Sequence, residues 1–401
     1  MRFLLLLLIN LTLEANLLQE AVDRAAPFST IKLNAANYKG DVTITKPLKI
    51  IGLEDGVVIE GSGRGSVITI KSDGVVLQNL HIRNSGSSMQ RIDAGISLKN
   101  AADIQIIGCK IEEVLYGIDM EMVRDSLFEK NSITTRKNSI ALRGDGLKIY
   151  YSHNNTFLNN RIYATRDVTL NYSNFNIFRG NRFEANRYAT HLANSHSNRF
   201  IQNKYSANSV AMMFMGTKDT EVIENSIVSS KGAAGIGVMI GGVSNFTLKK
   251  NRISFNAKAI YIQGQEKGIG MKRYIIDNEI SYNKEALHFH ATIKDNTIRK
   301  NRIFGNIDDV VKDVSGGFGS NNVVEYNYWD RYAGFDRDRD GVGDTPHEVY
   351  QYSDMLWHHN HKIKFFYASP VLTLLNFLSN LAPFVEPNLI MRDEKPTYLS
   401  P

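Results

Sequence analysis

Cysteine is almost absent from this sequence, because the 401 residues contain only one, Cys109. A single thiol cannot form an internal disulfide bond, so the fold must be stabilised by its packed core. A large excess of charge of one sign is also missing, since the formal net charge is +6. This mild basicity favours acidic partners but is too small to indicate nucleic-acid binding, and the chain has neither a helix-turn-helix pattern nor zinc-finger spacing. The sequence therefore gives no support for a nucleic-acid-binding protein.

Long hydrophobic runs are few, and none is typical of a membrane-spanning helix. The chain begins MRFLLLLLINLTLEA, in which Arg2 precedes an apolar run that ends before Ala15. This arrangement predicts a secretory signal peptide over residues 1–15, and the run is too short to span a bilayer. A buried N-terminal segment is the alternative. Export without disulfide bonds fits a bacterial periplasm, so we expect a periplasmic protein.

One short phrase is repeated many times instead: an apolar residue, two spacers, Asn, usually a charged residue, and then Ile or another large apolar residue. Its asparagine stands at positions 131, 160, 181, 203, 225, 251, 278, 301 and 327. Steps of 21 to 29 residues with strand-type alternation are typical of a solenoid. Buried amides need partners, so we expect each Asn to pair with the Asn of the next coil. We predict an all-β fold, a right-handed parallel β-helix of about 12 coils, its hand following from the rule for parallel crossovers.

The solenoid is expected to occupy residues 28–330. Before it, residues 16–27 carry apolar side chains at helical spacing up to Pro27, which predicts a short helix covering the open edge of the first coil. An Asp-rich loop at 331–350 and a non-repeating tail at 351–401 follow. The tail is apolar, but polar residues and proline interrupt it, so it is a poor transmembrane span. We expect the tail to dock on a partner; a cap folded over the last coil is the alternative.

Aligning the coils by the repeated Asn predicts which residues share the outer face of one sheet. Because side chains alternate along a strand, the neighbours of each inward residue must point outward. The outward residues that could bind metal are Met213, Met215, Met239 and His191, with His288 and His290 further on, beyond Tyr261. Thioether and imidazole ligands favour Cu(I), so we predict a copper site on this face. A protein-contact patch is the alternative reading of these methionines.

The same alignment makes three further predictions about this face and the core. Met120 and Met122 fall on the inward side of their strand, so both are expected in the core. Cys109 occupies the turn position of the repeated Asn, which predicts a structural role. The outward positions contain no pair of carboxylates, and that absence disfavours a catalytic site of the acid–base kind.

Two other patterns near the end of the chain suggest metal binding. The first matches positions 1, 3, 5 and 9 of a calcium-binding loop and consists of Asp336, Asp338, Asp340 and Asp344. His347 stands where such a loop has glutamate, so a charged turn is the alternative. The second is a histidine run, a weaker candidate for divalent metal, formed by His358, His359 and His361.

Several motifs together resemble the NosD family of periplasmic β-helix proteins. They are GDVTITKPLKIIG and VIEGSGRGSVITI near the N-terminus, the N-R-I coils, and NYWDRYAGFDRDRDGVGDTPHEVY at the end of the solenoid. The resemblance covers nearly the whole chain. It implies a non-enzymatic factor that assists assembly of the copper–sulfur site of nitrous oxide reductase. It also implies work with an ABC-type permease and its ATPase, a copper chaperone and the reductase, with membrane contact only through the permease.

A β-helix enzyme that acts on polysaccharide, as a lyase or an epimerase, is the competing function. The family motif does not identify copper ligands, so the methionine and histidine positions above remain a prediction from the strand alignment alone.

Overall fold

The described part of the chain begins after the predicted signal peptide. The computed structural model describes residues 16–136, 139–232, 234–264, 272–290, 292–314, 318–319, 321–351, 361–366, 369–381 and 388–398. Residues 1–15 lie outside it, so the signal peptide stays a prediction.

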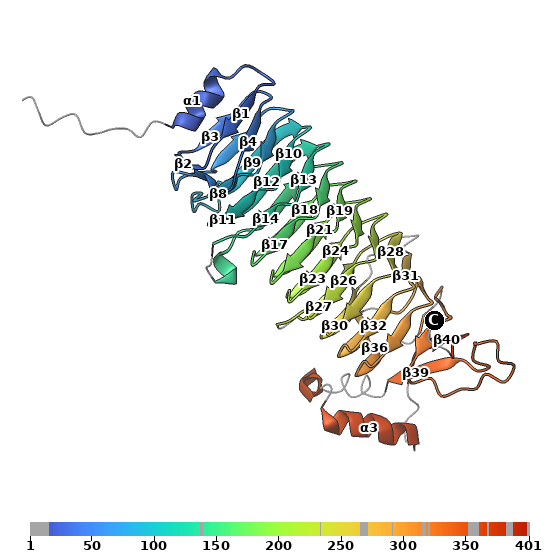
Figure 1. The fold of residues 1–401 in the computed structure, drawn as a ribbon. Coiled ribbons are helices and arrows are strands. Elements are labelled where there is room, and N and C mark those ends of the chain that lie inside the picture. The colour runs from blue at the N-terminus through green and yellow to red at the C-terminus, as the bar shows by residue number, and fades with distance from the viewer. Residues whose placement is uncertain are drawn as a thin grey trace, which may run out of the picture.

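Three parallel sheets wind around one elongated core, and each coil except the last contributes one strand to each sheet (Figure 1). We name them sheets A, B and C in chain order. Sheet A contains β1 (Thr30–Leu33), β4 (Lys49–Gly52), β7 (Val76–Gln78), β10 (Gln105–Ile107), β13 (Leu127–Glu129), β16 (Thr156–Leu158), β19 (Ile177–Arg179), β22 (Arg199–Ile201), β25 (Glu221–Ile223), β28 (Phe246–Lys249), β31 (Arg273–Ile276), β34 (Asn296–Arg299) and β37 (Val323–Glu325).

Sheets B and C follow the same order. Sheet B contains β2 (Ala36–Lys39), β5 (Val57–Glu60), β8 (His81–Arg83), β11 (Lys110–Glu112), β14 (Ser132–Ile133), β17 (Arg161–Tyr163), β20 (Arg182–Glu184), β23 (Lys204–Ser206), β26 (Ser226–Val228), β29 (Arg252–Ser254), β32 (Glu279–Ser281), β35 (Arg302–Phe304) and β38 (Tyr328–Trp329). Sheet C contains β3 (Val42–Ile44), β6 (Ile68–Ile70), β9 (Ala94–Ala102), β12 (Tyr116–Arg124), β15 (Leu147–Tyr150), β18 (Asp167–Asn171), β21 (Tyr188–Ala193), β24 (Val210–Met215), β27 (Ile236–Gly241), β30 (Lys258–Gln263), β33 (Glu285–His290) and β36 (Asp308–Lys312). The predicted right-handed parallel β-helix of about 12 coils is confirmed.

The repeated asparagines form a continuous buried ladder. Asn203 is typical: its Oδ1 accepts from the backbone N–H of Asn181 at 2.9 Å and from Asn181 Nδ2 at 3.0 Å. Its own Nδ2 donates to Phe178 O at 2.9 Å and to Asn225 Oδ1 at 3.0 Å. At the N-terminal end the backbone N–H of Cys109 donates to the first Asn, as the sequence alignment predicts. Each amide thus closes its corner and ties it to the next coil.

Aromatic rings stack in the same manner inside sheet A. The centroids of Phe157 and Phe178 are 4.4 Å apart with an interplanar angle of 7°, and Phe178 and Phe200 are 5.0 Å apart. All three rings are fully buried. Such pairs add about 0.5–1.5 kcal/mol each beyond the area that they bury. The identical residue in each coil therefore packs on its own copy one strand spacing away.

Each end of the solenoid is covered. Helix α1 (Leu17–Arg24) begins at Asn16, whose Oδ1 accepts from Gln19 N at 3.0 Å, and it buries Leu18 and Val22 on the first coil (Figure 1). At the other end β39 (His347–Gln351) pairs antiparallel with β40 (Asn388–Asp393). Asp393 accepts from Asn327 Nδ2 at 2.8 Å and so ends the asparagine ladder.

The tail predicted at 351–401 therefore contains two different parts. Ile390 and Met391 of β40 belong to the main core, so residues 388–398 act as the cap that was the alternative reading. Helix α3 (Pro370–Leu381) instead exposes most of its apolar side chains, and η2 (His361–Phe366) precedes it. A short helix, η1 (Ile140–Leu142), leaves the solenoid near its middle. No helix within the described ranges is long and apolar enough to cross a membrane.

The prediction that Met120 and Met122 share the core is wrong for Met122. Met120 is fully buried, whereas Met122 is 52% exposed. The backbone of Met122 has φ +55°, in the left-handed region, so the strand turns a corner there and side-chain alternation fails. The neighbouring strand has Asn100 in the same conformation. The corner belongs to the coil geometry, and a period-two rule applied across it gives the wrong face.

Candidate functional site

The outer face of sheet C carries the predicted metal ligands in two columns. Strand register pairs His191 with Met213, and Met213 with Met239, in the first column. Met215 pairs with Gly241 in the second column. These pairings confirm the alignment drawn from the repeated Asn. They place three sulfur or imidazole groups in three successive coils, about 4.8 Å apart along the column.

Local packing leaves space for the long methionine side chains. Gly241 lies under Met215, and a Cβ at that glycine would come within 2.8 Å of Met215 Sδ. The absence of a side chain at Gly241 is therefore what allows the thioether to lie over this strand. Met213, Met215 and Met239 are all half-buried, as is His191. We call these four residues the methionine cluster.

His191 has the electronic state that a metal ligand requires. Burial lowers the pKa of its imidazole, and the nearby Arg187 guanidinium lowers it further against the opposing effect of Asp167. A neutral ring keeps a lone pair for coordination at neutral pH. The Tyr188 ring lies 5.6 Å from that of His191 and forms one side of its surroundings.

His288 and His290 do not join the methionine cluster. Tyr261 stands between Met239 and His288 in the register, and its ring centroid is 4.8 Å from that of His288. His288 is covered, with only 4% of its surface exposed, and it bonds to Glu285. His290 Nδ1 lies 2.6 Å from Asp313 Oδ1. The six predicted copper ligands thus divide into a group of four and a separate pair.

Carboxylates approach this face from beside the aligned outward positions, which themselves hold no carboxylate pair. Asp167 begins β18 and acts on the pKa of His191, and Asp145 precedes β15. Arg166 Nε is 3.9 Å from a carboxylate oxygen of Asp145 and 3.4 Å from one of Asp167. Thr169 Oγ1 donates to Asp145 Oδ2 at 3.2 Å, but Asp145 Oδ1 is buried without a hydrogen-bond partner. Burial, with a smaller contribution from Asp167, raises the pKa of Asp145 to about 7.

The sequence alignment missed these acidic groups, and Glu285 and Asp313, for one geometric reason. It used only the two residues that flank each inward position, whereas these carboxylates approach from the strand beginnings or from the turn after a strand. Extending the same alignment three residues toward the N-terminus would have found Glu285 beside His288. Asp313 follows β36 in an irregular stretch, and the repeat does not reach it.

The Asp-rich loop brings together three of its four predicted ligands. Carboxylate oxygens of Asp336, Asp338 and Asp340 all lie within 4.8 Å of one another, and one oxygen of Asp336 is buried without a hydrogen-bond partner. Asp344 has a different position, because its Oδ2 accepts from the backbone N–H of Arg337 at 3.0 Å and closes the loop. The three grouped carboxylates suit a hard cation such as Ca²⁺.

The positions of the histidine run relative to one another lie largely outside the described structure. His358 and His359 lie outside the described residues, and His361 begins η2. Metal binding by this run stays a prediction.

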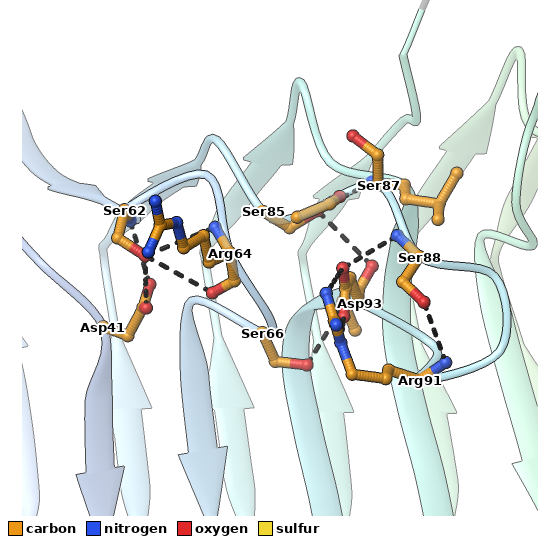
Figure 2. A network of polar contacts seen from close by, with 12 residues as sticks. Asp41, Ser62, Arg64, Ser66, Ser85, Ser87, Ser88, Arg91 and Asp93 are labelled. Carbon is orange, nitrogen blue, oxygen red and sulfur yellow. Dashed lines mark hydrogen bonds and ion pairs between the residues drawn. The ribbon is translucent and has the colours of Figure 1, made fainter.

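A contrasting polar network lies in the loops that join sheet B to sheet C in the first coils (Figure 2). Asp93 is 1% exposed and accepts from the backbone N–H of Ser88 at 2.8 Å and from Arg91 at 3.2 and 3.3 Å. Asp41 similarly accepts from the N–H of Ser62 at 3.0 Å. Both carboxylates are satisfied by the chain itself, so we assign this network a structural role.

Comparison with known proteins adds independent information about the family and the fold of this chain. A model of the NosD family, described as "Periplasmic copper-binding protein (NosD)", matches residues 129–334. A "Probable ABC transporter binding protein NosD" of Pseudomonas aeruginosa is 27% identical over 385 residues, which cover 92% of this chain and 88% of that protein. A protein of the same description from Stutzerimonas stutzeri is 24% identical, over 88% of this chain and 84% of that protein.

Solved structures with similar folds are more distant in sequence. The A-module of the Azotobacter vinelandii mannuronan C-5 epimerase AlgE4 has a TM-score of 0.52 at 14% identity, covering 78% of this chain and 94% of that one. The N-terminal fragment of bacteriophage Phi29 gene product 12 has a TM-score of 0.55 at 11% identity, covering 76% and 68%. At such identities the likeness shows the fold alone.

Fold and outer face together define a parallel β-helix protein with a thioether and imidazole cluster on one sheet. The family match covers more than half of the chain. The chain belongs to the NosD family, whose model describes periplasmic copper-binding proteins.

Proposed function

We propose that this protein is a non-enzymatic periplasmic scaffold that handles Cu(I) during assembly of the copper–sulfur site of nitrous oxide reductase. The observation that carries the proposal is the column His191–Met213–Met239, with Met215 lying over Gly241 in the adjacent column. Soft thioether sulfur and neutral imidazole prefer Cu(I) to the hard cations. The family description and the names of the relatives support copper binding and work with an ABC transporter.

The copper proposal predicts a large loss of affinity when the thioethers are removed. In a competition titration of Cu(I) against a chromophoric chelator, Met213→Leu/Met239→Leu is expected to bind more than about tenfold more weakly than wild type, which is about 1.4 kcal/mol. Leucine keeps the volume and apolarity of methionine, so folding is retained. Met122→Leu is the matched control, because this methionine is exposed and far from the cluster in the coil order. Equal Cu(I) affinity in the double variant and the wild type would remove the site.

Within the tail that we expect to dock on a partner, α3 is the segment that we propose makes the contact. Val371, Leu374, Phe377 and Leu381 are each more than half exposed, whereas Leu372 is 6% exposed. Such an apolar surface on a 12-residue helix is typical of a segment that binds a partner. We propose that α3 binds the permease of the ABC transporter. The copper chaperone and the reductase are further proposed partners of the scaffold.

Co-purification with the permease in detergent tests this assignment. Leu374→Ser/Phe377→Ser is expected to abolish it, because two exposed apolar anchors are lost. Thr373→Ser on the same helix should retain it. Binding of both variants to the same extent would count against α3 as the docking element.

We also propose that the Asp-rich loop binds Ca²⁺ through Asp336, Asp338 and Asp340. The mutual approach of their carboxylates and the unpartnered oxygen of Asp336 support it. A rise in the melting temperature on addition of Ca²⁺, absent in Asp338→Asn, is the expected result. No rise in the wild type would contradict it.

A polysaccharide-acting enzyme is the second candidate, and Asp145 is the observation that favours it. A carboxyl group with a pKa of about 7 is suited to general acid–base chemistry. Against it, Arg187 bonds both oxygens of Asp167, which ties up the second carboxylate. Cleavage or epimerisation of a uronic-acid polymer, lost in Asp145→Asn, would establish the enzyme instead of the scaffold.

A further inference from the structure

A shallow groove crosses three successive coils where the turns that leave sheet C enter sheet A. It has a volume of about 310 Å³ and lies at the starts of β10, β13 and β16. This volume is at the lower end of the range of small-ligand sites. The groove is separate from the methionine cluster, which lies on the outer face of sheet C. Its lining includes the apolar Leu127 and five polar side chains, which are Asp103, Gln105, Asp125, Asn154 and Thr156.

Most of the polar side chains in this groove are not used by the protein itself. Asp125 accepts from Arg124 Nη1 at 3.0 Å. Within the described part of the chain, the side chains of the other four polar residues form no hydrogen bond or ion pair with the protein. The loops of Figure 2 differ, because Asp41 and Asp93 are satisfied there by their own chain. The groove therefore offers a carboxylate, two amides and a hydroxyl to a ligand.

Phe175 occupies the next step of the turn position that forms one wall of the groove. Asp103, Asp125, Asn154 and Phe175 are equivalent in four successive coils, and each has φ between +54° and +60°. Asn, Asp and Gly adopt this left-handed conformation readily, whereas a bulky residue there is an outlier. The equivalent residues of other coils that share this conformation are small or polar, namely Gly74, Ser197, Asp219, Asn245, Asp295 and Asn321. An aromatic ring at this position therefore departs from the local preference of the repeat.

Packing within the protein does not explain the Phe175 ring. Its side chain is 57% exposed, and among the described residues no other ring contacts it. Tyr151 and Tyr172 lie in the same turns, stack with their ring centroids 5.2 Å apart, and are 43% and 44% exposed. Exposed aromatic side chains grouped on one surface are typical of a binding site. A free ring at the end of a groove with unused polar groups therefore indicates a ligand.

We propose that this groove binds an uncharged glycan, with Phe175 as the platform for one sugar ring and the unused polar side chains as partners of the hydroxyl groups. Sugar rings have apolar C–H faces and hydroxyl edges, so they match an aromatic ring beside carboxylate and amide groups. Two carboxylates disfavour an anionic polymer. Arg124 beside Asp125 and the neutral side chains of the lining disfavour a strongly cationic one. The site does not rest on the copper-scaffold function, since it shares no residue with the methionine cluster.

Calorimetric titration of the full chain with chitotetraose and cellotetraose, two neutral tetrasaccharides, tests the proposal. Tetragalacturonate and tetralysine are the anionic and cationic comparison chains. We expect a neutral tetrasaccharide to bind and neither charged chain to displace it. Phe175→Asn should weaken this binding more than about tenfold, because the stacking platform is lost, and Asn154→Ala should weaken it about three- to tenfold. No binding of either neutral sugar at millimolar concentration, or binding of tetralysine in their place, would overturn the proposal.

Two features of the variants separate lost binding from lost structure. Phe175→Asn introduces the residue type that neighbouring coils use at this turn, so its melting temperature should equal or exceed that of wild type. Phe255→Asn is the matched control, because Phe255 is 56% exposed and has φ +58° at the corner between sheets B and C. This control should bind the sugar as wild type does. Equal affinity in Phe175→Asn and wild type, or the same loss in Phe255→Asn, would also overturn the proposal.

Discussion

The inside and the outside of this solenoid use polar side chains in opposite ways. Along the ladder, each Asn from Asn131 to Asn301 bonds to the next coil, and none of these amides is left without a partner. On the outer face of sheet C, buried polar atoms of Asp145, Gln263 and His288 have no hydrogen-bond partner. Interior polar groups therefore define the fold, whereas the incomplete outer ones indicate where a ligand or a proton belongs.

Breaking the ladder should have the largest effect. Asn203→Ala removes four side-chain hydrogen bonds and leaves the N–H of Asn181 buried without an acceptor. We expect a loss of about 5–7 kcal/mol in the free energy of unfolding, from about 1 kcal/mol for each of the four bonds and about 1–3 kcal/mol for the orphaned donor. Chemical denaturation measures it. A loss below about 1 kcal/mol would show that water replaces the amide and that the ladder is not needed for stability.

The two methionines on β12 allow a buried and an exposed side chain to be compared on one strand, because Met120 and Met122 are two positions apart. Met120→Ala empties a fully buried position and is expected to cost about 2–5 kcal/mol. Met122→Ala changes a side chain that is 52% exposed and is expected to stay within about 0.5 kcal/mol of wild type. Thermal and denaturant unfolding of the pair check this, and similar losses in both would mean that the corner at Met122 is wrongly placed.

The smallest expected effect is the change in the free energy of unfolding with pH as Asp145 titrates. Its folded pKa of about 7 is above the value near 3.8 of an unperturbed Asp, so the protonated form stabilises the fold. That contribution is complete below about pH 4 and is lost as pH rises through 7, on the order of 2 kcal/mol between pH 5 and 7. The stability of Asp145→Asn relative to wild type should therefore be greater at pH 8 than at pH 5. A difference between the two proteins that does not change with pH would contradict the assignment.

The fold could be predicted because one residue type has one role in every coil. Asn recurs where the chain turns a corner, and the same apolar residue precedes it, so the period identifies both the architecture and the register. The register then identified the column from His191 to Met239. Both are local, periodic properties of the sequence.

The remainder of the site could not be predicted because it depends on irregular features. Met122 lies at a left-handed corner, which the period-two rule does not include. Asp313 reaches His288 and His290 from the next coil, and its position follows from a turn rather than from the repeat. That part of the tail caps the solenoid could not be predicted for a similar reason. Asp393 is the last acceptor of the ladder, and it lies 66 residues after its donor Asn327 in the sequence.

The parallel stacking of the coils also fixes a length. Four strand steps in sheet C separate β24, which holds Met213, from β36 at the end where the cap and α3 lie (Figure 1). At about 4.8 Å per step, the methionine cluster stands about 19 Å from that end. Because every coil is hydrogen-bonded to the next, this reach changes only by whole coils and not by bending. A relative with one coil more or fewer would hold the methionine cluster one strand spacing further from or nearer to α3, so the number of coils sets the distance between these two parts of the molecule.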